Sequence, residues 1–214
     1  MSESQLSTPE PIPEAENAAA PVRKRPKPGE RRVQILQALA TMLEQPGAER
    51  ITTAALAARL EVSEAALYRH FASKAQMFEG LIEFIEQSVF TLVNQITERE
   101  SAGATQAVKV MTMLLQFAEK NPGMTRVMVG DALVFENDRL QQRMNQFFDK
   151  IEATLKQSLR TSGDGDGSAT PSADAQVKAS MLTSFAVGRL QRFARSGFRR
   201  MPSEHLEASL ALML

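Results

Sequence analysis

From Glu30 to the C-terminus, apolar side chains recur at spacings of three and four residues. No stretch alternates between apolar and polar positions as a half-buried strand does. The first such stripe begins at Ile35 and ends before Pro46-Gly47, a pair that favours a turn. Similar stripes follow to the end of the chain. The sequence therefore predicts an all-α protein of about nine helices.

The same periodicity places most of the later helices. A long helix is expected from Ser73 to about Arg99, and a second from about Thr105 to the turn signal Asn121-Pro122-Gly123. The segment 124–135 is apolar on nearly every side, which predicts a single buried helix. Further helices are expected at about 140–160, 173–195 and 203–214, with a flexible loop at 161–172.

Composition excludes several classes of protein. The chain of 214 residues has no Cys and only two His, which excludes disulfides, thiolate metal sites and paired catalytic histidines. No apolar run approaches the roughly 18 residues of a membrane helix, and residues 1–20 do not resemble a signal peptide. We therefore expect a soluble, cytoplasmic protein that is not an enzyme and has no catalytic residues, metal or cofactor.

Charge is distributed unevenly along the chain. Lys+Arg and Asp+Glu both number 25, so the net charge names no partner. Residues 1–22 hold four acids and no base, and six of the ten prolines lie within 1–28, which predicts a disordered tail. The run 23–32 is strongly basic, and residues 23–80 carry a net charge of +4. This run is either a solvated charge cluster or a basic arm beside a nucleic-acid site.

The segment that follows the arm favours the second interpretation. Thr52 or Thr53 can cap a short helix, Glu61-Val62 forms a tight connection, and Ser63 can cap a second helix. Two short helices joined by such a turn are typical of a helix-turn-helix. The small residues that open the second helix would let it approach base edges in the major groove.

Polar side chains near the end of that helix have the chemistry of phosphate donors. Tyr68, His70 and Lys74 offer a hydroxyl, a ring N–H and an ammonium, and phosphate contacts of this kind set the register of a protein on DNA. Arg69 is a candidate for a bidentate contact with guanine. A lone Tyr or His is commonly structural, but these residues share the polar side of the expected recognition helix.

The stretch L-E-V-S-E-A-A-L-Y-R-H-F-A-S-K-A-Q-M-F, Leu60 to Phe78, resembles the DNA-binding signature of TetR-type regulators. Glu61 stands where this signature commonly has Gly, which implies a right-handed turn conformation there. The resemblance implies a helix-turn-helix domain at 29–89, with its motif at 52–71, and a helical dimerisation and partner-binding domain at 90–214. The implied DNA-contacting residues are Thr52, Thr53, Ser63, Glu64, Ala65, Ala66, Tyr68, Arg69, His70 and Lys74.

Segments outside the motif narrow the resemblance to nucleoid occlusion factors. They include E-K-N-P-G-M-T-R at 119–126 and A-L-V-F-E-N-D-R-L-Q at 132–141. The resemblance implies a nucleoid-associated homodimer that binds palindromic DNA and, while bound, engages the C-terminal tail of the division GTPase FtsZ and antagonises Z-ring assembly. Leu92 and Gln116 depart from the Arg and Gly of well-known members. The FtsZ tail would lie between the fourth and fifth helices, on Phe84, Leu92, Met113, Gln116, Lys120 and Asn121.

Two further surfaces are expected in the C-terminal half. Five arginines between 189 and 200 form a second basic cluster, which is either a solvated face or a site for an acidic partner or DNA. Apolar residues of the last helices are expected to form the dimer interface. They are Met181, Leu182, Phe185, Leu190, Leu206 and Leu210.

An alternative function is that of a ligand-responsive transcriptional repressor. Its C-terminal helices would enclose a small molecule, and four residues would line the pocket instead of filling a core. These residues are Met111, Met113, Met128 and Phe147.

Overall fold

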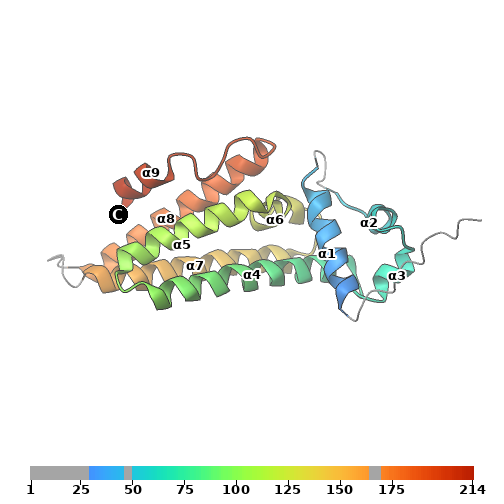
Figure 1. Ribbon diagram of the computed structural model, residues 1–214, viewed down its shortest axis with the longest axis horizontal. Coiled ribbons are helices and arrows are strands. Elements are labelled where there is room, and N and C mark those ends of the chain that lie inside the picture. The colour runs from blue at the N-terminus through green and yellow to red at the C-terminus, as the bar shows by residue number, and fades with distance from the viewer. Residues whose placement is uncertain (1–28, 46–49, 164–169) are drawn as a thin grey trace, which may run out of the picture.

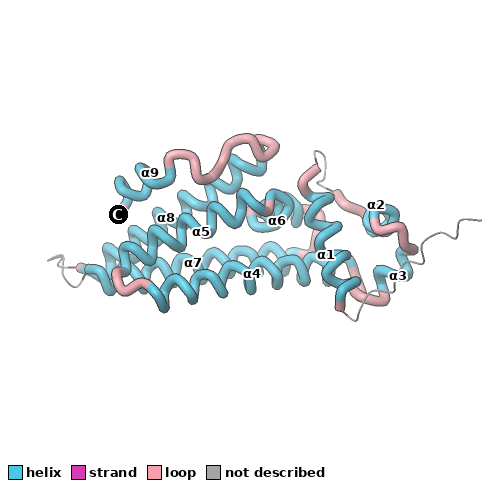
Figure 2. The backbone as a smooth tube through the Cα atoms, in the orientation of Figure 1, coloured by secondary structure: helices cyan, strands magenta, loops and turns pink. Residues whose placement is uncertain are grey.

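The computed structural model describes residues 29–45, 50–163 and 170–214, and over these residues it consists of helices and connecting turns (Figures 1 and 2). The all-α prediction is confirmed. The nine α-helices and one short 3-10 helix (η1) of the described residues are α1 (Glu30–Leu43), α2 (Thr53–Arg59), α3 (Glu64–Tyr68), α4 (Lys74–Arg99), α5 (Gly103–Lys120), α6 (Pro122–Met128), η1 (Asp131–Leu133), α7 (Asp138–Gly163), α8 (Pro171–Arg195) and α9 (Leu206–Met213).

The molecule is elongated, with a small head at one end of a long helical body (Figure 1). The head contains α1, α2 and α3. The body is built from α4, α5, α7 and α8, and α7 packs against both α5 and α8. α9 lies on the outside of the body and contacts α8. One continuous hydrophobic core runs from α1 to α9.

α4 belongs to both the head and the body. Its first turn is capped by Ser73, whose Oγ accepts from the Gln76 N–H at 3.2 Å. The Gln76 side chain reaches back, and its Oε1 accepts from the N–H of Ala72, the residue before the cap, at 2.8 Å. The helix then buries one apolar face as far as Val93. The boundary expected between residues 89 and 90 therefore lies inside an unbroken helix.

Ion pairs fasten α7 to α4. Arg143 donates from Nε and Nη2 to the two carboxylate oxygens of Glu86, at 3.1 and 2.6 Å. This hydrogen bonding raises the pKa of Arg143 above its usual value, so the guanidinium stays charged throughout the physiological range. Arg139 pairs with Glu79 one turn closer to the head. The two pairs fix the register of α7 along α4.

The prediction of one buried helix at 124–135 is wrong. α6 ends at Met128, and the chain turns at Gly130, whose backbone is left-handed with φ 85°. A side chain at that φ is strained, so glycine suits the break. Val134 and Phe135 then lie exposed, at 69% and 67%. The apolar run is divided between the core and a surface connection.

The expected loop at 161–172 is shorter than predicted at both ends. α7 continues to Gly163, and α8 begins at Pro171, where proline suits the first turn of a helix. The rest of the loop prediction, at 164–169, lies outside the described residues. So do the predicted disordered tail at 1–28 and the turn at Pro46-Gly47.

The joint between head and body depends on a glycine. Gly123, at the start of α6, lies so close to α1 that a Cβ built on it would be 1.9 Å from the carbonyl oxygen of Ala40. The obstacle is backbone, which cannot rotate away as a side chain can. On the other side of α6, Thr125 Oγ1 donates to the Ala118 carbonyl at 2.9 Å and ties α6 to α5. The head therefore sits on the body through backbone contact.

Gly123→Ala should lower the free energy of unfolding by at least about 2 kcal/mol, because α1 and α6 must move apart to admit the methyl group. Chemical denaturation followed by circular dichroism measures this change. Gly188→Ala is the matched control, since a Cβ there meets no atom of the protomer within 4 Å. Its effect should stay below about 1 kcal/mol. Equal stability of wild type and Gly123→Ala would contradict the joint described here.

Candidate nucleic-acid interface

Two hydroxyl caps define the helices of the head. Thr52 Oγ1 accepts from the Ala55 N–H at 3.1 Å and caps α2, and Ser63 Oγ accepts from the Ala66 N–H at 3.3 Å and caps α3. Both caps were among the sequence predictions and are confirmed. Leu67 then buries the inner side of α3. The outer side of α3 is left free for contacts with another molecule.

The turn between α2 and α3 differs from the prediction. Glu61 has φ 53°, a left-handed conformation and not the right-handed one expected. The cause is the hydrogen bonding that ends α2: the Val62 N–H donates to the Ala57 carbonyl at 3.0 Å, and the Glu61 N–H to the Ala58 carbonyl at 3.1 Å. This pair of bonds requires a left-handed residue between them. The turn keeps the geometry of a glycine turn with a side chain in place.

Three of the predicted DNA-contacting residues meet on one surface. Thr53 Oγ1 donates to Glu64 Oε2 at 2.6 Å, and the Tyr68 hydroxyl donates to Thr53 Oγ1 at 3.5 Å. The Tyr68 side chain stays 45% exposed. These contacts tie the first turn of α2 to both ends of α3. Hydroxyl groups from both helices therefore stand together at the surface, where a phosphate could reach them.

The other predicted residues of this segment have different settings. Thr52, Ser63, Ala65, Arg69 and His70 are exposed, and Ala66 is half-buried. Arg69 directly follows the last residue of α3. The exposed Ser63 and Ala65 give the start of α3 a low profile. A helix start of this kind can approach base edges closely.

Lys74 has a partner within the protein. Its ammonium lies 2.5 Å from Glu136 Oε1, in the connection between η1 and α7. It also lies 5.7 Å from the centre of the Phe78 ring. Lys74, predicted as a phosphate donor, thus links the start of α4 to the connection before α7. Its ammonium has three N–H donors, so it can contact a phosphate while it keeps Glu136.

Arg32 is a structural residue that sequence reasoning missed. Its Nη1 donates to the His70 carbonyl at 2.9 Å, and its guanidinium stacks 4.1 Å from the centre of the Phe71 ring. It belongs to the basic run at 23–32, where sequence alone does not separate it from its neighbours. α1 therefore fixes the end of the recognition segment through this one side chain.

The residues predicted for the dimer interface divide into two groups. Met181 is 48% exposed and Phe185 is half-buried. The four leucines of the set face the core of their own protomer, because α8 and α9 use them to pack against the body, and they are not available to a partner chain. They are Leu182, Leu190, Leu206 and Leu210. The open side of α8 instead carries Val177, Ser180 and Ser184 beside Met181, and these line a surface depression with Met213.

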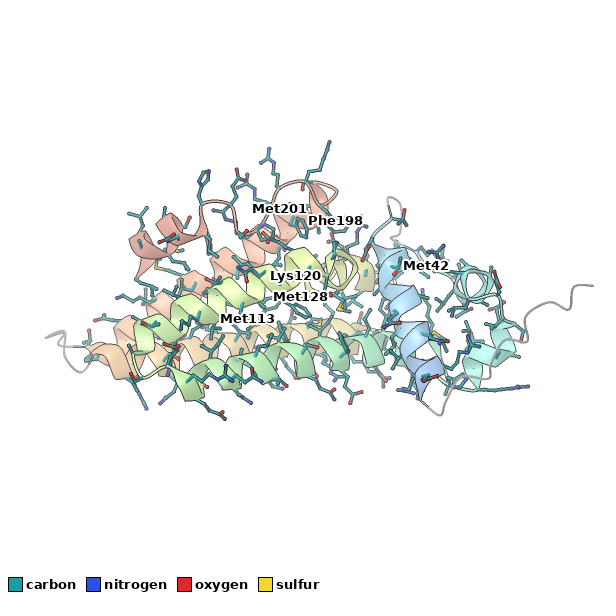
Figure 3. The ribbon with its side chains drawn as sticks, in the orientation of Figure 1. Met42, Met113, Lys120, Met128, Phe198 and Met201 are labelled. Atoms are coloured by element: carbon teal, nitrogen blue, oxygen red, sulfur yellow. The ribbon has the colours of Figure 1, made fainter. Side chains whose placement is uncertain are left out.

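The residues implied for FtsZ also fall on more than one surface. Phe84 and Leu92 are exposed on α4, at 48% and 39%. Met113 and Lys120 lie along α5 (Figure 3), the first half-buried and the second exposed. Asn121 donates from Nδ2 to the Phe117 carbonyl at 2.7 Å and closes α5. Gln116 lines a groove of about 680 Å³ between α5 and α9, which places it on the α9 side of the helix.

The residues of the alternative small-molecule pocket lie in the core. Of the residues proposed to line a small-molecule pocket, Met111, Met128 and Phe147 are fully buried in the continuous core, and Met113 packs against it. No group of three or more His, Asp or Glu in the described ranges could hold a metal ion. None of the described helices is both long and apolar enough to cross a membrane.

Comparison with known families agrees with this division of the chain. Residues 35–81 match the family model described as bacterial regulatory proteins of the tetR family. Residues 103–214 match the SlmA-like model described as tetracyclin repressor-like, C-terminal domain. The first match contains α2, α3 and most of α1, and the second contains α5 to α9.

Comparison with individual proteins narrows the family further than these two models do. The nucleoid occlusion factor SlmA of Idiomarina loihiensis is 50% identical over 183 residues, which is 86% of this chain and 93% of the relative. That of Photobacterium profundum is 52% identical over 178 residues, 83% of this chain and 90% of the relative. The chain belongs to the SlmA family of nucleoid occlusion factors. It is therefore a DNA-binding regulator of the TetR type, not an enzyme, and its resemblance to nucleoid occlusion factors is confirmed.

Solved structures of other TetR-type regulators share the fold. FadR from Bacillus subtilis, in complex with stearoyl-CoA, superposes with a TM-score of 0.66 at 15% identity and covers 85% of this chain and 96% of its own. AibR, in complex with isovaleryl coenzyme A and operator DNA, gives a TM-score of 0.67 at 13% identity, with coverage of 85% and 97%. At these identities the likeness concerns the fold alone.

Glu61→Gly should raise the free energy of unfolding by about 1 kcal/mol, because glycine adopts the left-handed backbone without the strain of a Cβ. Glu61→Ala is the control: it removes the carboxylate and keeps the strain, so it should bring no gain. Thermal unfolding of the two variants beside wild type gives the comparison. A gain as large for Ala as for Gly would show that the side chain, and not the backbone, is responsible.

Proposed function

We propose that this chain is a cytoplasmic, nucleoid-associated homodimer that binds palindromic chromosomal sites and, while bound, engages the C-terminal tail of FtsZ and antagonises Z-ring assembly over the nucleoid. The observation that carries the proposal is the identity of about 50% to nucleoid occlusion factors over more than four fifths of the chain. This identity includes the body, where regulators of other function share the fold at 13–15% identity.

On the DNA side, α3 is the element that enters the major groove. Ser63 and Ala65 have small side chains, so the N-terminal end of the helix can approach the bases closely. The planar guanidinium of Arg69 can make a bidentate contact with guanine. Tyr68 and His70 donate to phosphate oxygens on either side and set the register. The hydrogen bonds from Thr53 keep the first turns of both helices together at the backbone of the duplex.

On the protein side, the open surface of α8 supports a dimer. Val177 and Met181 are large apolar side chains exposed at 59% and 48%, and they share one side of the helix. Pairing this surface with its copy would bury it and set two heads on one molecule. Recognition helices of such dimers lie about 34 Å apart, one turn of DNA, so the preferred site is palindromic.

The exposed apolar side chains of α4 suit a docked peptide. Phe84 and Leu92 lie two helical turns apart on α4, and their exposed apolar side chains offer two contacts for a peptide laid along the helix. Lys120, at the end of α5, adds a positive charge for a carboxylate. Leu92 stands where well-known members have an arginine. The contact with the peptide would therefore depend less on an ion pair and more on the burial of apolar surface.

The alternative of a ligand-responsive repressor predicts a different response. FadR and AibR, which share the fold, were solved with acyl-coenzyme A molecules. In this chain, three of the four residues proposed to line such a pocket are buried in the hydrophobic core. A repressor would release DNA on binding a small molecule and would ignore an FtsZ tail peptide.

Tyr68→Phe should weaken DNA binding about fivefold, the effect of losing one hydrogen bond of about 1 kcal/mol to a phosphate. The loss should be equal on a palindromic site and on an unrelated duplex, because phosphates carry no sequence information. Fluorescence anisotropy at fixed salt measures both affinities. Wild-type affinity in the variant would remove Tyr68 from the interface.

Phe84→Ala should weaken binding of a fluorescent FtsZ C-terminal tail peptide to the DNA-bound protein at least tenfold, since a buried aromatic anchor is lost. Val134→Ala is the matched control, because Val134 is an exposed apolar residue outside the α4–α5 surface. Anisotropy titrations with and without duplex DNA give the two affinities. If the DNA-bound wild type fails to bind the peptide, the division-control part of the proposal is wrong, while DNA binding stands.

A further inference from the structure

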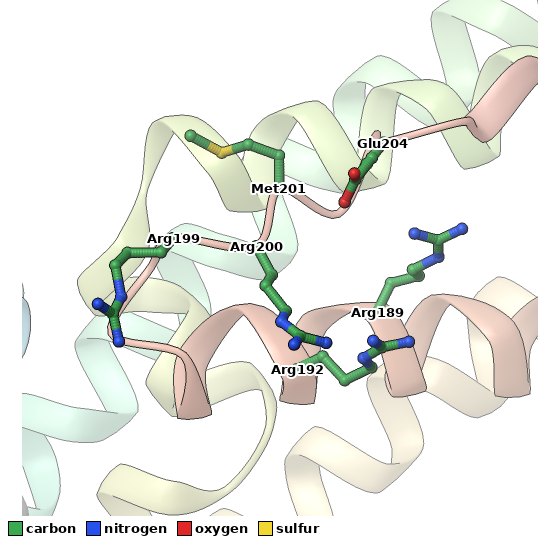
Figure 4. Close-up of a pocket in the computed structure, with 6 residues that line it drawn as sticks. All are labelled: Arg189, Arg192, Arg199, Arg200, Met201 and Glu204. Carbon is green, nitrogen blue, oxygen red and sulfur yellow. The ribbon is translucent and has the colours of Figure 1, made fainter.

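Four arginines line one pocket on the body, apart from α2 and α3. The pocket has a volume of about 480 Å³, and its lining consists of Arg189 and Arg192 from α8, Arg199 and Arg200 from the segment that follows, and two further residues, Met201 and Glu204 (Figure 4). The lining residues include four guanidinium groups and one carboxylate. The local charge is therefore +3, in a chain whose overall charge is zero.

The backbone after α8 is folded so that the two segments face each other. Gly197 and Phe198 are both left-handed, with φ 62° and 63°. The Phe198 N–H donates to the Phe193 carbonyl at 2.9 Å, and the two rings pack edge to face with centres 5.2 Å apart. This reversal has the bonding of a Schellman motif. It turns the chain back over the last turns of α8 and carries residues 199 and 200 with it.

Additional hydrogen bonds hold the returning segment in place. Ser196 Oγ accepts from the backbone N–H of Arg199 at 3.0 Å and of Arg200 at 2.9 Å. Further along, the Ser203 N–H donates to Glu119 Oε1 of α5 at 2.8 Å. The segment is thus fixed at both ends. A site whose backbone is already ordered loses little conformational entropy when a ligand binds.

The arginines have few partners of their own. Among the described residues, no ion pair involves any of the four. Arg199 donates from Nε to the Ser196 carbonyl, and Arg189 makes a long contact of 3.4 Å with Ser209 Oγ. Like charges that line one pocket repel one another, and an anion bound there relieves that repulsion. The planar forks of the guanidinium groups match the oxygens of a phosphate group.

We propose that this pocket binds a compact polyanion with at least two linked phosphate groups, such as an oligophosphate or the phosphate chain of a nucleotide. The volume lies in the range of small-molecule sites. A compact anion brings several charges to one point, as the four arginines require. The acidic segment of this chain, by contrast, spreads its four carboxylates from Glu3 to Glu16. We therefore infer a small phosphate compound as the ligand, in preference to the acidic segment of this chain.

Isothermal titration of the full chain with sodium tripolyphosphate at low ionic strength tests the proposal. Wild type should bind, and the double variant Arg192→Gln/Arg200→Gln should bind at least tenfold more weakly. Arg195→Gln is the matched control, an exposed arginine of the same helix outside the pocket lining, and it should bind like wild type. Circular dichroism confirms that each variant is folded. Absence of binding to wild type, or equal binding by the double variant, would overturn the proposal.

Two further measurements test duplex DNA and the acidic segment of this chain as alternative ligands. The double variant should keep its affinity for duplex DNA, and a loss of DNA binding as large as the loss of tripolyphosphate binding would show instead that the pocket is part of the DNA surface. A synthetic peptide of residues 1–22 should bind more weakly than tripolyphosphate. Tighter binding of the peptide, lost in the double variant, would assign the pocket to the acidic segment and overturn the proposal.

Discussion

The close approach of α6 to α1 is the contact on which the rest of the structure depends. Gly123 leaves room for the Ala40 carbonyl, where any side chain would collide with backbone. Because both partners are main-chain atoms in helices, the head cannot pivot on the body by rotation of side chains. The ion pair of Lys74 with Glu136 adds a second attachment. The orientation of α3 is therefore set by the body.

In this arrangement the helices of the head are fixed relative to one another, and one side chain near the DNA surface, Lys74, has a contact that DNA could change. Arg32 ties α1 to the end of the recognition segment, and Thr53 ties α2 to α3. Lys74 is the exception, since its ammonium pairs with Glu136 and also stands at the start of α4, where a phosphate would attract it. With three N–H donors, this ammonium can contact a phosphate and Glu136 together. DNA binding at the head therefore involves a lysine that also contacts Glu136, in the connection that precedes α7.

Local features of this fold could be predicted from the sequence, and features that depend on distant contacts could not. The side-chain caps at Thr52, Ser63 and Ser73 involve residues three apart, and all three are present. The partner of Lys74 lies 62 residues away, so a pattern search sees only an exposed cation. The prediction of a right-handed turn at Glu61 was wrong because the backbone hydrogen bonds that end α2 require a left-handed residue there. A side chain can occupy that position, at a cost in conformational strain.

The same distinction explains the partner surfaces. Leucines at helical spacing on α8 and α9 read equally well as a dimer interface or as a core, and only the packing of the body shows that Leu182 and Leu190 face inward. Gln116 was assigned to a groove with α4 from the resemblance alone, and in the structure it is exposed and lines the groove between α5 and α9. The basic cluster at 189–200 could be seen, but not that a backbone reversal folds it into a pocket.

The distance between the two heads of a dimer tests the central claim, that the body holds the recognition helices rigidly for DNA, most directly. The chain has no cysteine, so Ala58→Cys, at an exposed position of α2 outside the proposed DNA contacts, provides one labelling site per protomer for pulsed electron–electron spin resonance. The account predicts a single narrow distribution, consistent with recognition helices roughly 34 Å apart, that is unchanged by a palindromic duplex to which the labelled protein binds. A broad distribution that narrows only with DNA would contradict it.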